Sequence, residues 1–94
     1  MKYILYWEIN PERLDEAIKK LSKIVPDESG KYPKKLSASY SLGGQLYGIR
    51  LVEATHEQLT NLMVNALPDV TFRFEPIFEF PEIVKKYREL SQAL

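Results

Sequence analysis

The chain has 94 residues, which is enough for one small domain with a single hydrophobic core. It has no cysteine, so disulfides, thiolate metal sites and cysteine nucleophiles are excluded. Its 13 basic and 13 acidic side chains cancel, so no net charge attracts nucleic acid or anionic lipid. We expect residues 1–94 to form one cytoplasmic domain without a signal peptide or a membrane span.

The first third of the chain predicts a strand, a helix and a loop. Residues 2–9 alternate in the manner of a β-strand. Asn10 and Pro11 form a helix-start signal, because asparagine caps free amides and proline suits the first helical position. Apolar residues then recur at three- and four-residue spacing up to Val25, which predicts an amphipathic helix that a proline ends. Residues 27–35, with three lysines, are expected to form a mobile, solvated loop.

The middle of the chain predicts a hairpin. Residues 36–42 alternate strictly, with serines on one side, and residues 45–53 form the partner strand. Gly43-Gly44 predicts the turn between them, because glycine accepts the positive φ angles of tight hairpins.

The last third predicts a helix, a strand and a further helix. Thr55 and Gln58 fit a capping box at the start of an amphipathic helix. Residues 70–80 predict the last strand, and Pro76 places it at a sheet edge because proline donates no hydrogen bond. Residues 81–94 predict an appended C-terminal helix.

This order of elements predicts an α+β domain of the ferredoxin-like βαββαβ type. The expected sheet has four antiparallel strands in the order 4-1-3-2, and both main helices cover the same face. Alternation predicts the side chains on the face left open: Ile4, Tyr6, Glu8, Ser37, Ser39, Ser41, Leu46, Gly48, Arg50, Val52, Thr71, Arg73, Glu75 and Ile77. Since apolar side chains lie beside charges there, we expect a contact surface, with Ile4, Tyr6, Glu8, Arg50, Val52, Arg73, Glu75 and Ile77 in a dimer interface.

Aromatic side chains on the opposite face are candidates for a ligand cavity. Trp7, Tyr40, Phe72 and Phe74 could line a site for an aromatic ligand, although an alternating aromatic stripe is more often core.

The polar candidates are few. Glu8, Arg50, Arg73 and Glu75 are expected to form an ion-pair network or to recognise a small acid. His56, the only histidine, is expected to be a surface residue, and with no cysteine we expect neither a metal site nor a cofactor. No catalytic residue can be named.

Several short motifs resemble the DUF3303 family of the dimeric α/β-barrel superfamily over most of the chain up to about Phe80. These motifs are Tyr3 and Trp7 on the first strand, Gly43-Gly44, Gly48, Leu51-Val52-Glu53-Ala54, and Phe74-Glu75-Pro76-Ile77. The resemblance implies a homodimer in which two open sheet faces meet and close a barrel. It also implies that a ligand, in several members of the superfamily, sits between sheet and helices.

Three functions remain open. The first is a homodimer that binds a small molecule or regulates, without catalysis. The second is a cofactor-free enzyme of the monooxygenase or isomerase type. The third is RNA binding, which the zero net charge disfavours, as does the expectation that Tyr47 points at the helices.

Overall fold

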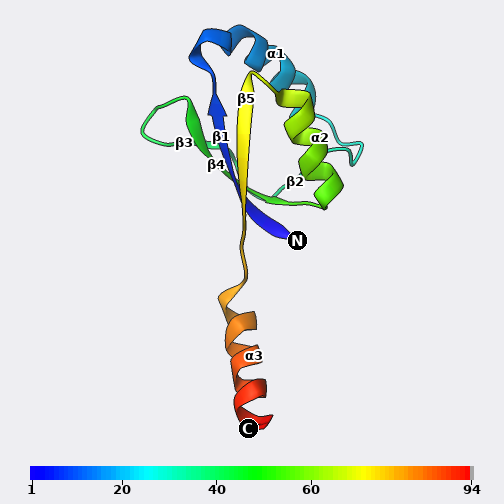
Figure 1. Cartoon of the computed structure of the whole chain (residues 1–94), viewed down its shortest axis with the longest axis vertical. Coiled ribbons are helices and arrows are strands. Elements are labelled where there is room, and N and C mark those ends of the chain that lie inside the picture. Colours follow the sequence, from blue (N-terminus) through cyan, green and yellow to red (C-terminus); the bar gives the residue numbers. More distant parts are fainter. Residues whose placement is uncertain (94) are drawn as a thin grey trace.

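The computed structural model describes residues 1–93, which form an antiparallel sheet with three α-helices (Figure 1). The elements follow the chain as β1 (Lys2–Ile9), the 3-10 turn η1 (Pro11–Arg13), α1 (Leu14–Ile24), β2 (Lys34–Lys35), β3 (Tyr40–Ser41), β4 (Tyr47–Glu53), α2 (His56–Ala66), β5 (Val70–Pro76) and α3 (Phe80–Ala93). The α+β class predicted from the sequence is confirmed.

The five-stranded sheet has the order β2-β4-β1-β5, and β3 also pairs with β4. The central strand β1 is antiparallel to both β4 and β5. The edge position predicted for the strand with Pro76 is confirmed. Helices α1 and α2 cover one sheet face, and their side chains form the core with those of the sheet: Leu5, Ala17, Ile24, Val52, Leu62, Ala66 and Val70.

The second strand differs from the prediction. Instead of one strand over 36–42, two short strands, β2 and β3, pair with opposite ends of β4. Between them the hydroxyl of Ser37 accepts a hydrogen bond from the backbone N–H of Leu51 at 2.9 Å. A side-chain acceptor thus replaces a backbone carbonyl, as serine does when it competes with a regular ladder. The predicted strand count and order are therefore only partly correct.

The predicted turn and caps are confirmed. Gly43 and Gly44 have φ angles of 65° and 76°, as a tight hairpin turn requires. The side chain of Asn10 accepts from the N–H of Glu12 at 3.1 Å. At the start of α2, Thr55 and Gln58 form the reciprocal bonds of a capping box.

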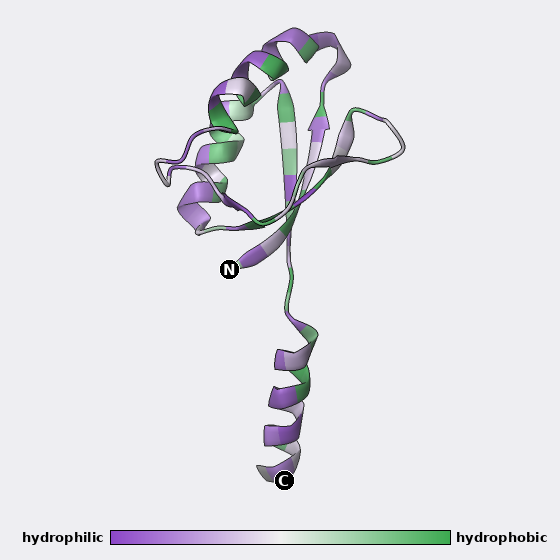
Figure 2. Ribbon diagram, turned by 180° about the vertical axis from the view of Figure 1, so that it is seen from behind, coloured by the Kyte–Doolittle hydropathy of each residue, from purple (hydrophilic) through white to green (hydrophobic). Residues whose placement is uncertain are grey.

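Helix α3 projects from the body along the long axis of the molecule, which measures 57 × 32 × 19 Å (Figures 1 and 2). The strand before it ends at Pro76, earlier than predicted. The N–H of Ile77 donates to the carbonyl of Lys2 at 3.0 Å, and β1 has no further residue to pair beyond that point. None of the α3 residues from Phe80 to Gln92 belongs to the core.

Candidate functional site

The register of the sheet decides which side chains face the helices. β1 and β4 align Leu5 with Arg50 and Tyr3 with Val52, and directly paired residues project to the same side. Leu5 and Val52 are both buried in the core. Arg50 and Val52 therefore face the helices, and their predicted place on the open face is wrong. The side of β4 with Ile49 and Leu51 is more apolar than the side with Arg50, so alternation alone does not show which side faces the helices.

A cavity of about 280 Å³ lies between the sheet and the two helices. Its floor consists of side chains from three strands: Leu5, Trp7, Ile9, Arg50, Val52, Val70 and Phe72. Leu21 and Ile24 of α1 and Leu62 of α2 form the walls. The cavity is therefore mainly aliphatic and aromatic, which is typical of a small-molecule site.

Two of the residues that line this cavity carry a buried polar atom without a partner. Trp7 Nε1 and Arg50 Nε are buried, and neither forms a hydrogen bond within residues 1–93. No carboxylate in that part of the chain forms an ion pair with Arg50. Burial lowers the pKa of Arg50, but a guanidinium remains protonated at neutral pH. The lining thus includes a half-buried guanidinium and an indole N–H, both of which donate hydrogen bonds and accept none.

Of the four predicted ligand-binding residues, the structure brings two to the cavity. Trp7 and Phe72 are direct neighbours on β1 and β5, and both line it. Phe74 is outside the lining and stacks on Phe72, with ring centroids 6.2 Å apart. Tyr40 pairs with Ile49 on the opposite face and is 58% exposed. Its predicted place beside Trp7 is wrong, because the interrupted second strand does not keep a continuous alternation.

The loop between α1 and β2 closes one side of the cavity, which the sequence analysis missed. The cavity-lining residues from this segment are Val25, Asp27, Tyr32, Pro33 and Lys35. Two amides of α2 hold the loop: Gln58 Nε2 donates to the carbonyl of Gly30 at 2.9 Å, and Asn61 Nδ2 donates to that of Lys31 at 3.0 Å. The signal in the sequence was Tyr32, an aromatic residue within a stretch of charged and small residues.

The opposite face of the sheet, here called the open face, carries a polar cluster around Tyr6. The guanidinium carbon of Arg73 lies 3.9 Å from the centre of the Tyr6 ring. The Tyr6 hydroxyl donates to Glu75 Oε2 at 3.1 Å, and Arg73 Nη1 is 4.0 Å from the same oxygen. Ile4 lies beside Tyr6 on this face, paired with Leu51 and Glu75, and Ile77 follows the end of β5.

The four-residue polar cluster predicted from the sequence does not form. Glu8 is paired with Tyr47 and Thr71, while Arg50 lies on the helix side. Tyr47, which was expected to point at the helices, is on the open face and 45% exposed. The cause is again the phase of β4.

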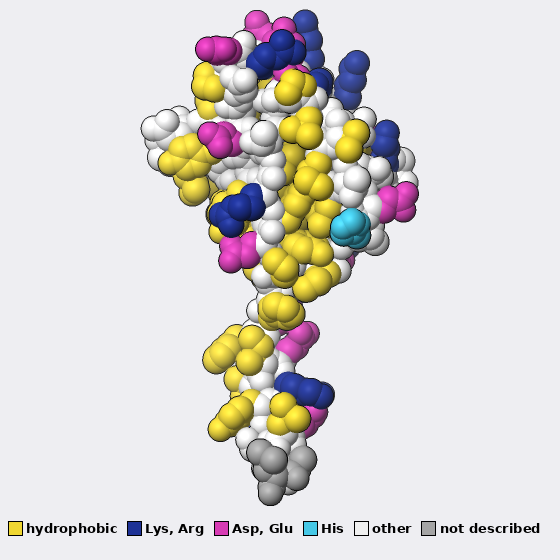
Figure 3. All heavy atoms as spheres, in the orientation of Figure 1, with side chains coloured by type: hydrophobic (Ala, Val, Ile, Leu, Met, Phe, Trp, Pro, Cys, Tyr) yellow, Lys and Arg dark blue, Asp and Glu magenta, His cyan; other side chains and the backbone are white. Residues whose placement is uncertain are grey.

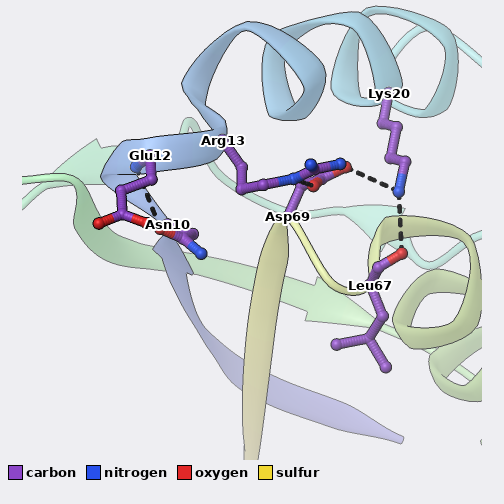
Figure 4. A network of polar contacts seen from close by, with 6 residues as sticks. All are labelled: Asn10, Glu12, Arg13, Lys20, Leu67 and Asp69. Atoms are coloured by element: carbon purple, nitrogen blue, oxygen red, sulfur yellow. Dashed lines mark hydrogen bonds and ion pairs between the residues drawn. The ribbon is translucent and has the colours of Figure 1, made fainter.

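A second polar network joins α1 to the start of β5 and has a structural role (Figure 4). The side chain of Asp69 is fully buried and bound by Arg13 Nε at 2.6 Å and Lys20 Nζ at 2.7 Å. Lys20 also donates to the carbonyl of Leu67 at 2.8 Å. The hydrogen bonds from Lys20 and Arg13 hold the pKa of Asp69 below its ordinary value. With both oxygens occupied, Asp69 is a link between elements rather than a free acid or base.

His56 is the exposed first residue of α2, as the sequence predicted for a surface position. Within residues 1–93, no three histidine, aspartate or glutamate side chains come together to hold a metal ion. None of the helices in that range is both long enough and apolar enough to cross a membrane.

Comparison with protein-family models gives no match, and comparison with curated proteins gives none either. The family resemblance noted in the sequence therefore stays a prediction.

Proposed function

We propose that this protein binds a small molecule in the cavity between sheet and helices and acts as a homodimer of ferredoxin-like α/β-barrel domains. The cavity carries the proposal. It measures about 280 Å³, whereas engineered apolar cavities of about 150 Å³ already hold benzene. A bicyclic aromatic molecule is therefore of a suitable size.

Trp7 makes this proposal directly testable. It is the only tryptophan, so its indole N–H gives a single resonance in a ¹H–¹⁵N correlation spectrum. We expect titration with 2-naphthoate or its neutral amide, 2-naphthamide, to shift that resonance saturably. The variant Leu62→Phe, which adds volume to a cavity wall, should abolish the shift, whereas Val64→Phe on the exposed side of α2 should not. If neither compound moves the resonance in the wild-type protein, the proposal of a ligand cavity fails.

The homodimer is supported by two apolar surfaces that nothing within residues 1–93 covers. The open face presents aromatic and aliphatic side chains beside charges, including Tyr40, Tyr47 and Leu51 at 58%, 45% and 37% exposure. Surfaces of this kind mark contact sites. β5, β1 and β4 also lie in the relative order that the ferredoxin-like arrangement requires.

Helix α3 is the second such surface. Its exposed apolar residues recur at three- and four-residue spacing: Phe80, Ile83, Tyr87 and Leu90. Hydrophobic side chains extend from a band between β5 and α2 onto this helix (Figure 3). An isolated helix of 14 residues is marginal in water, so packing against a second copy would stabilise it.

The solution mass, measured by light scattering at micromolar concentration and two salt strengths, tests the dimer. We expect about twice 11.0 kDa at both. Ile49→Glu places a charge at the centre of the open face and should give a monomer, while Val64→Glu on α2 should not change the mass. A wild-type monomer would refute the dimer.

Catalysis is less well supported than binding. Among the described residues, Asp27 is the only carboxylate that lines the cavity, and hydrogen bonds from the Ser29 hydroxyl and N–H lower its pKa. Since a general base works best with a pKa near the working pH, Asp27 is a poor proton acceptor. Binding without chemistry is therefore the preferred function.

RNA binding gains one observation from the structure. Tyr6, Tyr40 and Tyr47 lie on the open face with Arg73, and aromatic rings with a nearby guanidinium can stack on single-stranded bases. Glu8 and Glu75 lie on the same face and would repel phosphates. Titration with single-stranded RNA at low salt tests whether the open face binds RNA rather than a second copy of the chain, and we expect no binding.

A further inference from the structure

The cavity lining is mainly apolar, but its few polar atoms favour one chemical class of ligand. Among the described residues that line it, the buried side-chain atoms without a hydrogen-bond partner are both donors, Arg50 Nε and Trp7 Nε1. Both side chains are half-buried, and a buried donor atom without an acceptor is unfavourable, more so when it belongs to a charged group. A ligand that brings an anionic acceptor relieves both.

We propose that the ligand carries a carboxylate that Arg50 binds, with the indole N–H of Trp7 as a further donor and an apolar body against Phe72 and Leu62. The inference rests on the proposed function, because it names the ligand class of the same cavity. The guanidinium group is suited to this role, since its planar fork matches the two oxygens of a carboxylate.

The other charged groups of the cavity do not compensate Arg50. Asp27 accepts hydrogen bonds from the hydroxyl and the N–H of Ser29, at 2.5 and 2.8 Å, and forms no ion pair with Arg50 within residues 1–93. Lys35 donates to the backbone carbonyl of Val25, which closes the base of the loop. An incoming anion therefore meets a cation whose positive charge is still uncompensated.

The position of Arg50 also defines how a ligand would be oriented. Arg50 is paired with Leu5 on the central strand, and Trp7 follows two residues later on the same side. Both residues thus belong to the sheet side of the cavity lining, while Leu21, Ile24 and Leu62 line it from the helices. The carboxylate would lie against the sheet beside Arg50, and the apolar body would extend past Phe72 to Leu62 of α2.

Matched aromatic ligands test this assignment without any mutation. 2-Naphthoate and 2-naphthamide have the same ring system and nearly the same shape, but only the first carries a charge. We expect 2-naphthoate to bind about 10- to 100-fold more tightly, as a charge-assisted hydrogen bond implies. The Trp7 indole resonance and isothermal titration calorimetry both report the affinity.

Arg50 variants separate the charge from the shape of the side chain. Arg50→Met keeps an unbranched stem but removes the guanidinium group, and it should lower the affinity for 2-naphthoate to that for 2-naphthamide, with 2-naphthamide itself unaffected. Arg50→Lys should give an intermediate affinity. Lys34→Met is the control, because Lys34 lies next to Lys35 outside the cavity lining and should leave both affinities unchanged.

The possible failures can be told apart. Equal affinity of the wild-type protein for the two compounds would overturn the carboxylate assignment and leave the cavity as a general apolar site. An unchanged preference for 2-naphthoate in Arg50→Met would remove Arg50 from the assignment. Should Arg50→Met fail to fold, Arg50→Lys and the comparison of the two compounds on the wild-type protein still decide. No response to either compound would refute the cavity as a ligand site altogether.

Discussion

Gly48 offers the sharpest test of the packing around Trp7. It lies opposite Trp7 in the sheet, in extended backbone without a positive φ angle. A Cβ atom placed on it would lie 2.5 Å from Trp7 Cζ2 and 1.9 Å from the carbonyl oxygen of Tyr40. The Tyr40 oxygen belongs to the backbone of β3, so β3, the indole or both must move in Gly48→Ala.

The expected sign of this substitution makes it informative. Replacing glycine by alanine inside a strand ordinarily stabilises a protein by about 0.5–1 kcal/mol, because the unfolded chain loses freedom. Overpacking costs about 1–3 kcal/mol and should dominate here, with a net loss of about 1–2 kcal/mol. At about 4–8 °C per kcal/mol for a domain of this size, the Tm should fall by about 4–16 °C.

Thermal unfolding measured by circular dichroism gives the Tm, and the fluorescence of the single tryptophan reports the displacement of the indole. Thr71→Ala, on an exposed position of β5, is the control for a substitution within the sheet and should leave the emission maximum unchanged. A Tm for Gly48→Ala that equals or exceeds that of the wild type would refute the close approach of Trp7 and β3 to this glycine.

The other predictions concern the polar links. Lys20 and Arg13 lower the pKa of Asp69, so its stabilising contribution is complete above an unfolded-state pKa of about 3.9 and is lost as the pH falls through the folded-state value. In urea unfolding between pH 2 and 7, the free energy of unfolding should fall more steeply with acid for the wild type than for Asp69→Asn. Parallel curves would contradict this prediction. Thr55→Ala removes the N-cap acceptor of α2 and should cost about 1 kcal/mol in urea unfolding, whereas an unchanged midpoint would mean that the cap contributes nothing. Asn61→Ala removes one attachment of the cavity loop and should speed amide hydrogen exchange in residues 27–35, while the free energy of unfolding changes by about 1 kcal/mol or less. Unchanged exchange there would show that this bond does not hold the loop.

The elements with strong local signals could be predicted from the sequence. The Asn10 cap, the Gly43-Gly44 turn and the Thr55–Gln58 capping box depend on nearest neighbours, and all three occur where the residues predict them. The edge position of the last strand followed from Pro76, whose missing N–H is a property of one residue.

The candidate site was predicted less well because it depends on register. A one-residue change of phase moves every side chain of a strand to the other face. In β4 the more apolar side, with Ile49 and Leu51, faces away from the helices, so Arg50 looked like a surface residue although it pairs with the buried Leu5. The predicted partner strand, residues 36–42, could not reveal the register of β4, because it is not continuous. The hydroxyl of Ser37 accepts the hydrogen bond from Leu51 N–H there, and alternation of side chains does not indicate such a bond. Trp7 and Phe72, on strands with clear alternation, were placed correctly.

The cavity loop and the start of α2 depend on the same side chain. Gln58 Oε1 accepts from the N–H of Thr55 at 2.9 Å, while its Nε2 donates to Gly30 at 2.9 Å. A substitution of Gln58 therefore weakens the helix start and releases the loop together, and a change in ligand affinity would have two causes. Asn61 lies one turn later; its side chain donates to the loop and takes no part in the capping box. Because the two amides share the loop but not the helix start, Asn61 is the position at which the contribution of the loop to ligand binding can be separated from the stability of α2.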